Sequence, residues 1–135
     1  MKSLFAGIQF NDQDPIYLQL VDFFKTQIAA GLLQNGDEVP SRRALAALSG
    51  INPMTVQKAY RLMEEEGFLA TSANSGSYIS LDDAKAARIK SSLCREQVVA
   101  FIRAMQAMQM DFKSVIDLIS IFWDQQQEDK ANVTK

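Results

Sequence analysis

The residues of this chain best suited to chemistry are hydrogen-bond donors. There is no histidine, and Cys94 is the single cysteine among 135 residues. Between positions 39 and 63 every charged residue is a cation, and the set comprises Arg42, Arg43, Lys58 and Arg61. Such side chains bind anions but make neither a metal site nor an acid–base pair. The pattern predicts an anion-binding surface and gives no support to an enzyme; no metal and no cofactor are expected.

Two of these cations lie in a segment expected to be a helix, residues 53–66. Asn52 is the predicted N-cap, Pro53 suits the first helical position, and Gly67 follows as a stop. At about 100° per residue, the inward face carries Val56, Ala59, Tyr60 and Met63. The outward face carries Met54, Gln57, Lys58 and Arg61, with no carboxylate among them. Such a face fits a DNA major groove, where glutamine reads adenine and lysine or arginine holds phosphates or guanine.

The preceding sequence predicts the elements that hold this helix. Residues 15–30 are expected to form a helix with Asp14 as N-cap, Pro15 at its first position and an apolar stripe that begins at Tyr17. Residues 42–49 are expected to form a second helix between the N-cap Ser41 and the stop at Gly50. Because only a short, glycine-containing turn separates 42–49 from 53–66, the two helices are predicted to form a helix-turn-helix.

The residues after position 67 predict a β-hairpin. Segments 68–69 and 78–81 are rich in β-prone residues, and they flank a turn at 74–76. A helix-turn-helix followed by a hairpin is a winged helix. The predicted fold is therefore mainly α with a small β-hairpin, and residues 1–81 are predicted to be a winged helix-turn-helix DNA-binding domain.

Two other interpretations stay open on the residues alone. A polar, basic outer face is what most amphipathic helices present to solvent. Winged helices also serve as protein–protein interaction modules in larger complexes, and a formal charge of −2 with a pI of about 5.1 fits that use. Net charge does not decide between them, because recognition depends on local fields. A steep salt dependence of DNA binding would distinguish a regulator from an interaction module.

A family resemblance is carried by two stretches, "PSRRALAALSGINPMTVQKAYRLMEEEGFL" and "SGSYIS". They resemble the DNA-binding domain of GntR-family transcriptional regulators over residues 9–80. The shared pattern is a Pro-Ser-x-Arg opening, a Thr-Val and an Ala-Tyr pair in the third helix, and Glu-x-x-Gly before the wing. The Asn-Pro-x-Thr-Val variant and the short C-terminal region are most similar to the YtrA subfamily.

The resemblance implies roles for the matching residues. Arg43 matches an arginine that reaches base edges. Positions at the start of the recognition helix that meet bases or phosphates are matched by Asn52, Met54, Thr55 and Gln57. The wing tip is matched by Ser75 and Gly76. Face geometry adds three predicted phosphate contacts, Arg42, Lys58 and Arg61. Two alternatives stay open: the Thr55 hydroxyl serves only the first turn of its helix, and Arg42 is a solvated side chain with no fixed partner.

The wing departs from the family pattern. Where the family usually carries arginines before the glycine turn, this chain has Ser72, Ala73 and Asn74. A wing without cations is expected to hold the minor groove weakly.

Residues 82–135 are predicted to be a short helical dimerisation region with a polar tail. Asp82 and Asp83 are expected to cap a long helix, and Asp111 is expected to start another. The apolar positions recur at three- and four-residue steps, and they are Ala87, Cys94, Val98, Phe101, Met105 and Met108 on the first helix and Phe112, Val115, Ile116, Ile119 and Phe122 on the second. The tail from residue 124 is expected to fray.

These stripes exceed what about 50 residues can bury on themselves, so they predict a two-fold homodimer; the alternative is that both close over the first helix. A dimer would occupy a pseudo-palindromic double-stranded DNA operator and act as a repressor. By resemblance, that operator is expected to control the chain's own operon. No signal peptide and no apolar run near 18 residues is found, so no membrane association and a cytoplasmic location are expected. Nothing in the sequence specifies a small-molecule effector.

Overall fold

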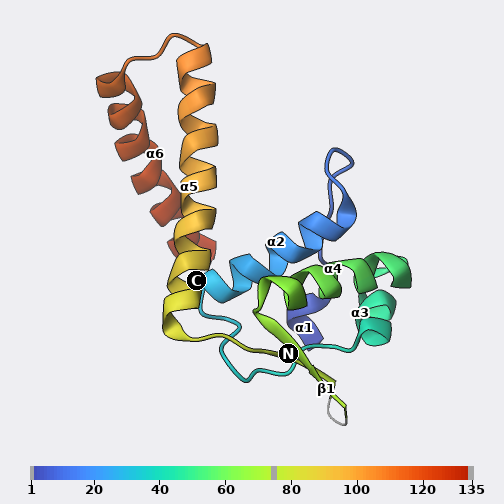
Figure 1. The fold of residues 1–135 in the computed structure, drawn as a ribbon. Helices are drawn as coiled ribbons and strands as arrows, with labels where there is room; N and C mark the ends of the chain where they lie inside the picture. The colour runs from blue at the N-terminus through green and yellow to red at the C-terminus, as the bar shows by residue number, and fades with distance from the viewer. Residues whose placement is uncertain (1, 74–75, 134–135) are drawn as a thin grey trace. The chain divides into compact units, whose positions relative to one another are not determined.

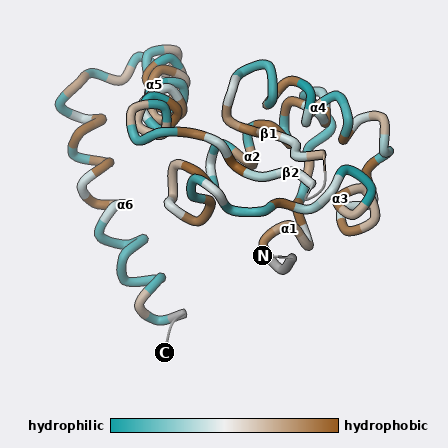
Figure 2. Tube along the Cα trace, turned by 60° about the horizontal axis from the view of Figure 1, so that its bottom comes forward, coloured by the Kyte–Doolittle hydropathy of each residue, from teal (hydrophilic) through white to brown (hydrophobic). Residues whose placement is uncertain are grey.

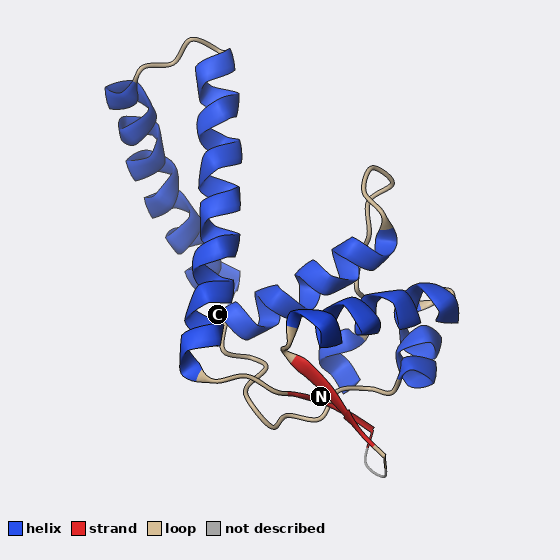
Figure 3. Ribbon diagram, viewed as in Figure 1, coloured by secondary structure: helices blue, strands red, loops and turns tan. Residues whose placement is uncertain are grey.

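The computed structural model describes residues 2–73 and 76–133 and is mainly helical with one β-hairpin, as predicted (Figures 1 and 3). In chain order the elements are α1 (Lys2–Phe5), α2 (Ile16–Ala29), α3 (Arg42–Ser49), α4 (Pro53–Glu66), β1 (Leu69–Ser72), β2 (Gly76–Ile79), α5 (Asp83–Ala107) and α6 (Phe112–Val133). The chain divides into two compact units, Met1–Leu93 and Cys94–Lys135. The division falls within α5 because Ala86 and Ile89 of its first turns pack against the core of the first unit.

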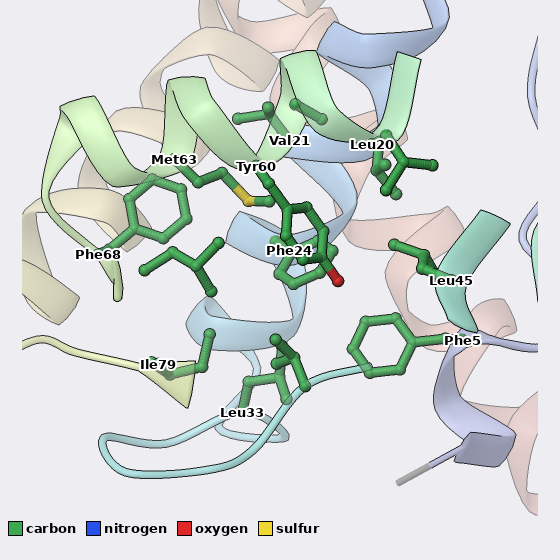
Figure 4. Packing of buried hydrophobic residues seen from close by; sticks show 14 of the residues in the cluster. Phe5, Leu20, Val21, Phe24, Leu33, Leu45, Tyr60, Met63, Phe68 and Ile79 are labelled. Carbon is green, nitrogen blue, oxygen red and sulfur yellow. The ribbon is translucent and has the colours of Figure 1, made fainter. Parts of the chain in front are cut away.

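The first unit has a closed apolar core between α2, α3, α4 and the hairpin. Figure 4 shows Phe24 and Tyr60 at its centre, with Leu45 and Phe5 to one side and Met63, Phe68 and Ile79 to the other. The Phe24 ring lies 5.2 Å from the Phe5 ring and 5.8 Å from the Tyr60 ring, between centroids. Aromatic pairs at such distances add to the hydrophobic contribution of their buried area.

The α1 helix was not predicted, because the first ten residues show only a short apolar cluster. Phe5 explains why the segment folds: its side chain is fully buried against Phe23 and Phe24 of α2. One residue of long-range packing thus orders a segment too short to be helical by propensity.

Caps fix the ends of the helices in the first unit. The Ser41 hydroxyl accepts from the Ala44 N–H at 3.1 Å, and Asn52 Oδ1 accepts from the Met54 N–H at 2.8 Å. Gly50 and Gly67 end α3 and α4 with φ of 73° and 86°, a left-handed conformation that favours glycine. These predicted boundaries are confirmed.

The start of α2 differs from the prediction. Pro15 rather than Asp14 is the N-cap, and no side chain caps the helix. The preceding loop is instead closed by Asn11, whose Oδ1 accepts from the N–H groups of Gln13 and Asp14. Gln19 donates back to the carbonyl of Asp14 at 2.8 Å. These bonds hold the loop against the first turn of α2, in which the Leu18 N–H donates to the Pro15 carbonyl at 3.1 Å.

The hairpin is antiparallel, with Leu69 opposite Ile79 and Ser72 opposite Gly76. A third segment lies beside it, because Glu38 pairs with Tyr78 and the Val39 N–H donates to the Ser77 carbonyl at 3.0 Å. The chain before α3 is therefore bonded directly to the hairpin. The sequence does not predict this pairing, because Val39 stands before a proline and its composition indicates only an extended backbone.

The second unit consists of the later turns of α5 and the helix α6. No residue of α5 is buried, and large apolar side chains of both helices are exposed, including Val98, Phe112, Ile121 and Trp123. Figure 2 shows apolar residues recurring along the first half of α6 and hydrophilic ones along its second half. Within the described residues α6 continues as a helix to Val133, and fraying of the tail from residue 124 stays a prediction.

Candidate nucleic-acid interface

The exposed face of α4 gathers most of the predicted contact residues. One surface hollow is lined by Met54, Thr55, Gln57, Lys58 and Arg61. Met54 has 71% of its surface exposed, whereas Thr55 and Gln57 are half-buried. The opposite face is buried, as predicted from the helical spacing of Val56, Ala59, Tyr60 and Met63. We call the five lining residues the reading face; they offer amide, hydroxyl and cationic donors and no carboxylate.

The reading face is held in place by Tyr60 on the buried side of α4. The Tyr60 hydroxyl donates to the Pro40 carbonyl at 2.5 Å, just before α3 begins. Burial raises the pKa of Tyr60 above its ordinary value, and the nearby charge of Arg42 opposes that rise. The phenol therefore stays a neutral donor at physiological pH. It fixes α4 against the segment that leads into α3.

The helix-turn between α3 and α4 is built from local hydrogen bonds. The Gly50 N–H donates to the Ala46 carbonyl at 3.0 Å, and the Ile51 N–H donates to the Ser49 hydroxyl at 3.3 Å. Ile51 is itself buried in the core. The turn thus fixes the start of α4 against the end of α3.

The two arginines that open α3 have different surroundings. Nη2 of Arg42 lies 2.9 Å from Oε1 of Glu64, and its guanidinium lies 5.8 Å from the Tyr60 ring centroid. The interpretation of Arg42 as a side chain without a fixed partner is therefore wrong. Arg43 is exposed and has no ion pair or hydrogen bond within residues 2–73 and 76–133. Arg43 is free to approach a ligand, whereas Arg42 is engaged within the protein.

Lys58 is exposed but held over an aromatic ring. Its Nζ lies 4.1 Å from the centroid of Tyr17 on α2, close enough for a cation–π interaction. The contact leaves the ammonium on the reading face while limiting its rotamers. A pre-positioned cation loses less entropy on binding a phosphate than a freely moving one.

The remaining predicted residues lie near the N-terminus of α4 or in the hairpin. Asn52 spends its Oδ1 on the cap, and the Thr55 hydroxyl has no hydrogen bond within the described part of the chain. Gly76 is exposed at the start of β2, with a φ of 80°. Ser75 lies outside the described residues. The described hairpin residues, 69–73 and 76–79, carry no charge.

Sequence reasoning missed Glu64. Three glutamates at 64–66 end α4, and the sequence assigns none of them a partner. Glu64 instead joins Arg42 of α3 to Thr71 of β1, whose hydroxyl donates to Oε1 at 2.8 Å. Because the three residues lie on different elements, 22 and 7 residues apart in the chain, no local periodicity reveals these contacts.

The structure also bears on other kinds of site. Within the described residues, no group of three His, Cys, Asp or Glu side chains could hold a metal ion. No helix described here is both long enough and apolar enough to cross a bilayer.

A winged helix-turn-helix with an exposed donor face on its second helix is the architecture of a DNA-binding transcription regulator. Comparison with known proteins assigns the family. The model of the "Bacterial regulatory proteins, gntR family" matches residues 16–79. The HTH-type transcriptional regulator YhcF of Bacillus subtilis is 30% identical over 114 residues, which cover 84% of this chain and 94% of YhcF. The chain belongs to the GntR family, and it is a transcription regulator, not an enzyme.

Two further likenesses refine the assignment. The HTH-type transcriptional repressor YtrA of B. subtilis is 38% identical over 90 residues, which cover 65% of this chain and 68% of YtrA. A GntR family transcriptional regulator from Listeria monocytogenes superposes with a TM-score of 0.76 at 29% identity, covering 82% of this chain and 97% of that one. These matches confirm the resemblance to YtrA-like GntR regulators and the combination of winged helix and helical C-terminal region.

Proposed function

We propose that this protein is a homodimeric repressor that binds a pseudo-palindromic operator, with α4 of each copy in a major groove. The observation that carries the proposal is the reading face: five neighbouring side chains around one surface hollow that offer donors and an apolar tip and include no carboxylate. B-DNA admits one α-helix in its major groove, and glutamine, lysine and arginine match its acceptors.

The proposed contacts divide by chemistry. Arg43 is assigned to a base edge because it is exposed and unpaired within the described residues. Gln57 and the apolar Met54 suit adenine and the thymine methyl group. Lys58 and Arg61 are assigned to phosphates, and the supporting contacts are Asn52, Thr55 and the wing-tip residues Ser75 and Gly76. Arg42 could reach a phosphate only by sharing or breaking its pair with Glu64.

The dimer is proposed from the second unit. Exposed apolar side chains along α5 and α6 leave a hollow lined by Phe101, Met105, Phe112 and Ile116, among others. Two helices that pack on each other bury only the sides that face each other. A second copy of the chain is proposed to bury the apolar sides that remain exposed. Two readers also improve specificity, since each mismatched base pair costs only about 1–3 kcal/mol. Residues 1–81 are then the DNA-binding part and 82–135 the dimerisation part.

Repression is proposed by analogy with the repressor YtrA. A dimer on an operator near a promoter blocks transcription by occupancy alone and needs no further domain. The proposed target is the operon that contains the gene for this chain, and the proposed place of action is the cytoplasm.

Selection of duplexes from a random pool by the full chain tests the proposal. The expected result is an enriched inverted repeat, called the selected duplex below, whose half-sites are separated by one helical turn or a multiple of it. Binding to it should weaken steeply with salt. Failure to enrich any sequence, with no salt-dependent binding to mixed DNA, would indicate a protein–protein interaction module instead.

A further inference from the structure

We infer that Glu64 is a positioning residue for DNA recognition: its carboxylate fixes the hairpin and the start of α3 against the last turn of α4. The inference rests on the proposed use of the hairpin as a wing. It concerns how the wing is held rather than which bases are read.

The carboxylate is the centre of a chain of polar contacts. Oε1 of Glu64 accepts from Arg42 Nη2 at 2.9 Å and from the Thr71 hydroxyl at 2.8 Å. The Thr71 hydroxyl also lies 3.2 Å from the Ser77 hydroxyl on the paired strand. Ser77 is only 5% exposed. One oxygen atom therefore joins α3, α4, β1 and, through Thr71, β2.

The position of this glutamate needs an explanation, because a carboxylate in the last turn of a helix opposes the helix dipole. Glu64 compensates through two donors. Its neighbour Glu65 is exposed and has no ion pair or hydrogen bond among the residues described. Both residues are glutamates in the last turn of α4, so they differ chiefly in that only Glu64 takes part in this network.

Arg42 depends on the same carboxylate. Its Nε is buried and has no hydrogen-bond partner within residues 2–73 and 76–133. Its guanidinium packs over the Tyr60 ring, and Glu64 supplies the acceptor for Nη2. The Arg42 side chain is 38% exposed, and Glu64 is the carboxylate with which its guanidinium is paired. Arg42 therefore links the start of α3 to the last turn of α4 within the protein.

The hairpin needs such a polar link to α4 because the chain passes from α4 into the hairpin through Gly67. Leu69 and Ile79 anchor its base in the core, and Thr71 and Ser77 form the pair two residues further out on the same side of the ladder. Since the described hairpin carries no charge, phosphate attraction cannot draw it into a groove. An uncharged wing contributes to binding only if it is already placed, which lowers the ordering cost on association.

The experiment compares Glu64→Ala with the matched control Glu65→Ala in the full chain. Both remove one negative charge from the same helical turn, but only Glu64→Ala also releases Arg42 from its ion pair. The scrambled duplex measures the resulting change in general DNA attraction. Binding is measured to the selected duplex and to its scrambled sequence. Glu64→Ala should lower the ratio of selected to scrambled affinity about fivefold relative to Glu65→Ala, as expected for a half-exposed tie. Equal ratios would overturn the inference.

A second pair isolates the hairpin link from the folding of α3. Thr71→Val removes the hydroxyl and leaves the Arg42–Glu64 pair, whereas Thr71→Ser retains the hydroxyl. Thr71→Val should lose selectivity in the same direction as Glu64→Ala, and Thr71→Ser should restore it. A loss in Glu64→Ala alone would refute the link to the hairpin and leave Glu64 a partner of Arg42 only.

A readout without DNA separates this inference from the proposed function. Amide hydrogen exchange at 69–72 and 76–79 should be several-fold faster in Glu64→Ala and Thr71→Val than in Glu65→Ala. If the wild-type chain selects no duplex but this difference is present, the proposed function fails and the tie stands. If exchange is the same in all variants, the tie is refuted whatever the DNA result.

Discussion

The two units of this chain contain similar apolar side chains but bury them very differently. In the first unit, Leu20, Phe24 and Tyr60 have no exposed surface. In the second, no residue of α5 is buried, and Phe112 is 81% exposed. Helical periodicity therefore identifies an apolar stripe but does not say what covers it.

Architecture explains the contrast. Around Phe24, three helices and a hairpin approach from different directions, so each apolar face meets another. A pair of helices has only one shared seam, and apolar residues that point elsewhere remain in contact with water. Exposed apolar patches of this kind mark interaction surfaces. The first unit is therefore expected to be self-sufficient, and the second is expected to need a partner.

The largest expected effect on stability comes from removing a side chain of the core of the first unit. Phe24→Ala should lower the free energy of unfolding by about 3–5 kcal/mol, because it removes a fully buried ring that contacts Phe5 and Tyr60. The matched change in the second unit, Phe112→Ala, should leave the stability of the first unit within about 0.5 kcal/mol. Urea denaturation monitored by circular dichroism measures both. Equal losses would show that the units do not differ as described.

Removing the second unit should come next in effect. A chain that ends at Leu93 keeps Ala86 and Ile89 in the core and should fold as a monomer. Its affinity for the selected duplex should fall at least about a hundredfold, because the two readers are no longer linked. Sedimentation and a binding titration provide the test. A shortened chain that still dimerises would place the interface in the first unit.

The sequence-based predictions succeeded where structure is set by neighbouring residues in the chain. Signals that act within one turn of chain were sufficient for the caps at Ser41 and Asn52 and for the stops at Gly50 and Gly67. Helical spacing predicted four residues of the reading face, the family resemblance added Thr55, and the structure brings all five around one hollow.

Features set by distant contacts could not be predicted. The burial of Phe5, the pairing of Glu38 with Tyr78 and the Glu64 network each join residues with no fixed spacing. Helical spacing predicts that Leu48 faces inward together with Leu45, yet Leu48 is 37% exposed and Ala46 is buried. In a helix of two turns, small differences in packing decide which residue is covered.

Within the first unit, base contacts and phosphate contacts should respond differently to substitution. Arg43→Ala should lose about 1–3 kcal/mol on the selected duplex and little on scrambled DNA, as expected for a base contact. Lys58→Ala should weaken both by a similar factor and make the salt slope shallower by about one. Loss of the Tyr17 contact should lower its melting temperature only slightly.

Salt titrations of both variants on the two duplexes, with thermal melting as the control, distinguish the roles. If both variants lose selected and scrambled binding in parallel, Arg43 is a phosphate contact. Specificity would then have to come from Asn52, Met54, Thr55 and Gln57.

The smallest effect is expected at the wing. Ser72→Arg combined with Ala73→Arg should tighten binding to all DNA by about 1 kcal/mol or less and steepen the salt dependence, because it adds cations to a hairpin that has none in its described part. Electrophoretic mobility shifts at several salt concentrations measure the change. Unaltered affinity would mean that the wing does not approach DNA, and Ser75 and Gly76 would no longer belong to the proposed interface.

The mass of the full chain, free and on the selected duplex, tests the central claim most directly. Analytical ultracentrifugation at micromolar concentration should give a free protein of about 30 kDa, twice the 15.1 kDa of one chain, and two chains on each duplex at saturation. A 15.1 kDa species that binds the duplex as a single copy with undiminished affinity would contradict the account. It would show that the exposed apolar faces of α5 and α6 serve something other than pairing two readers.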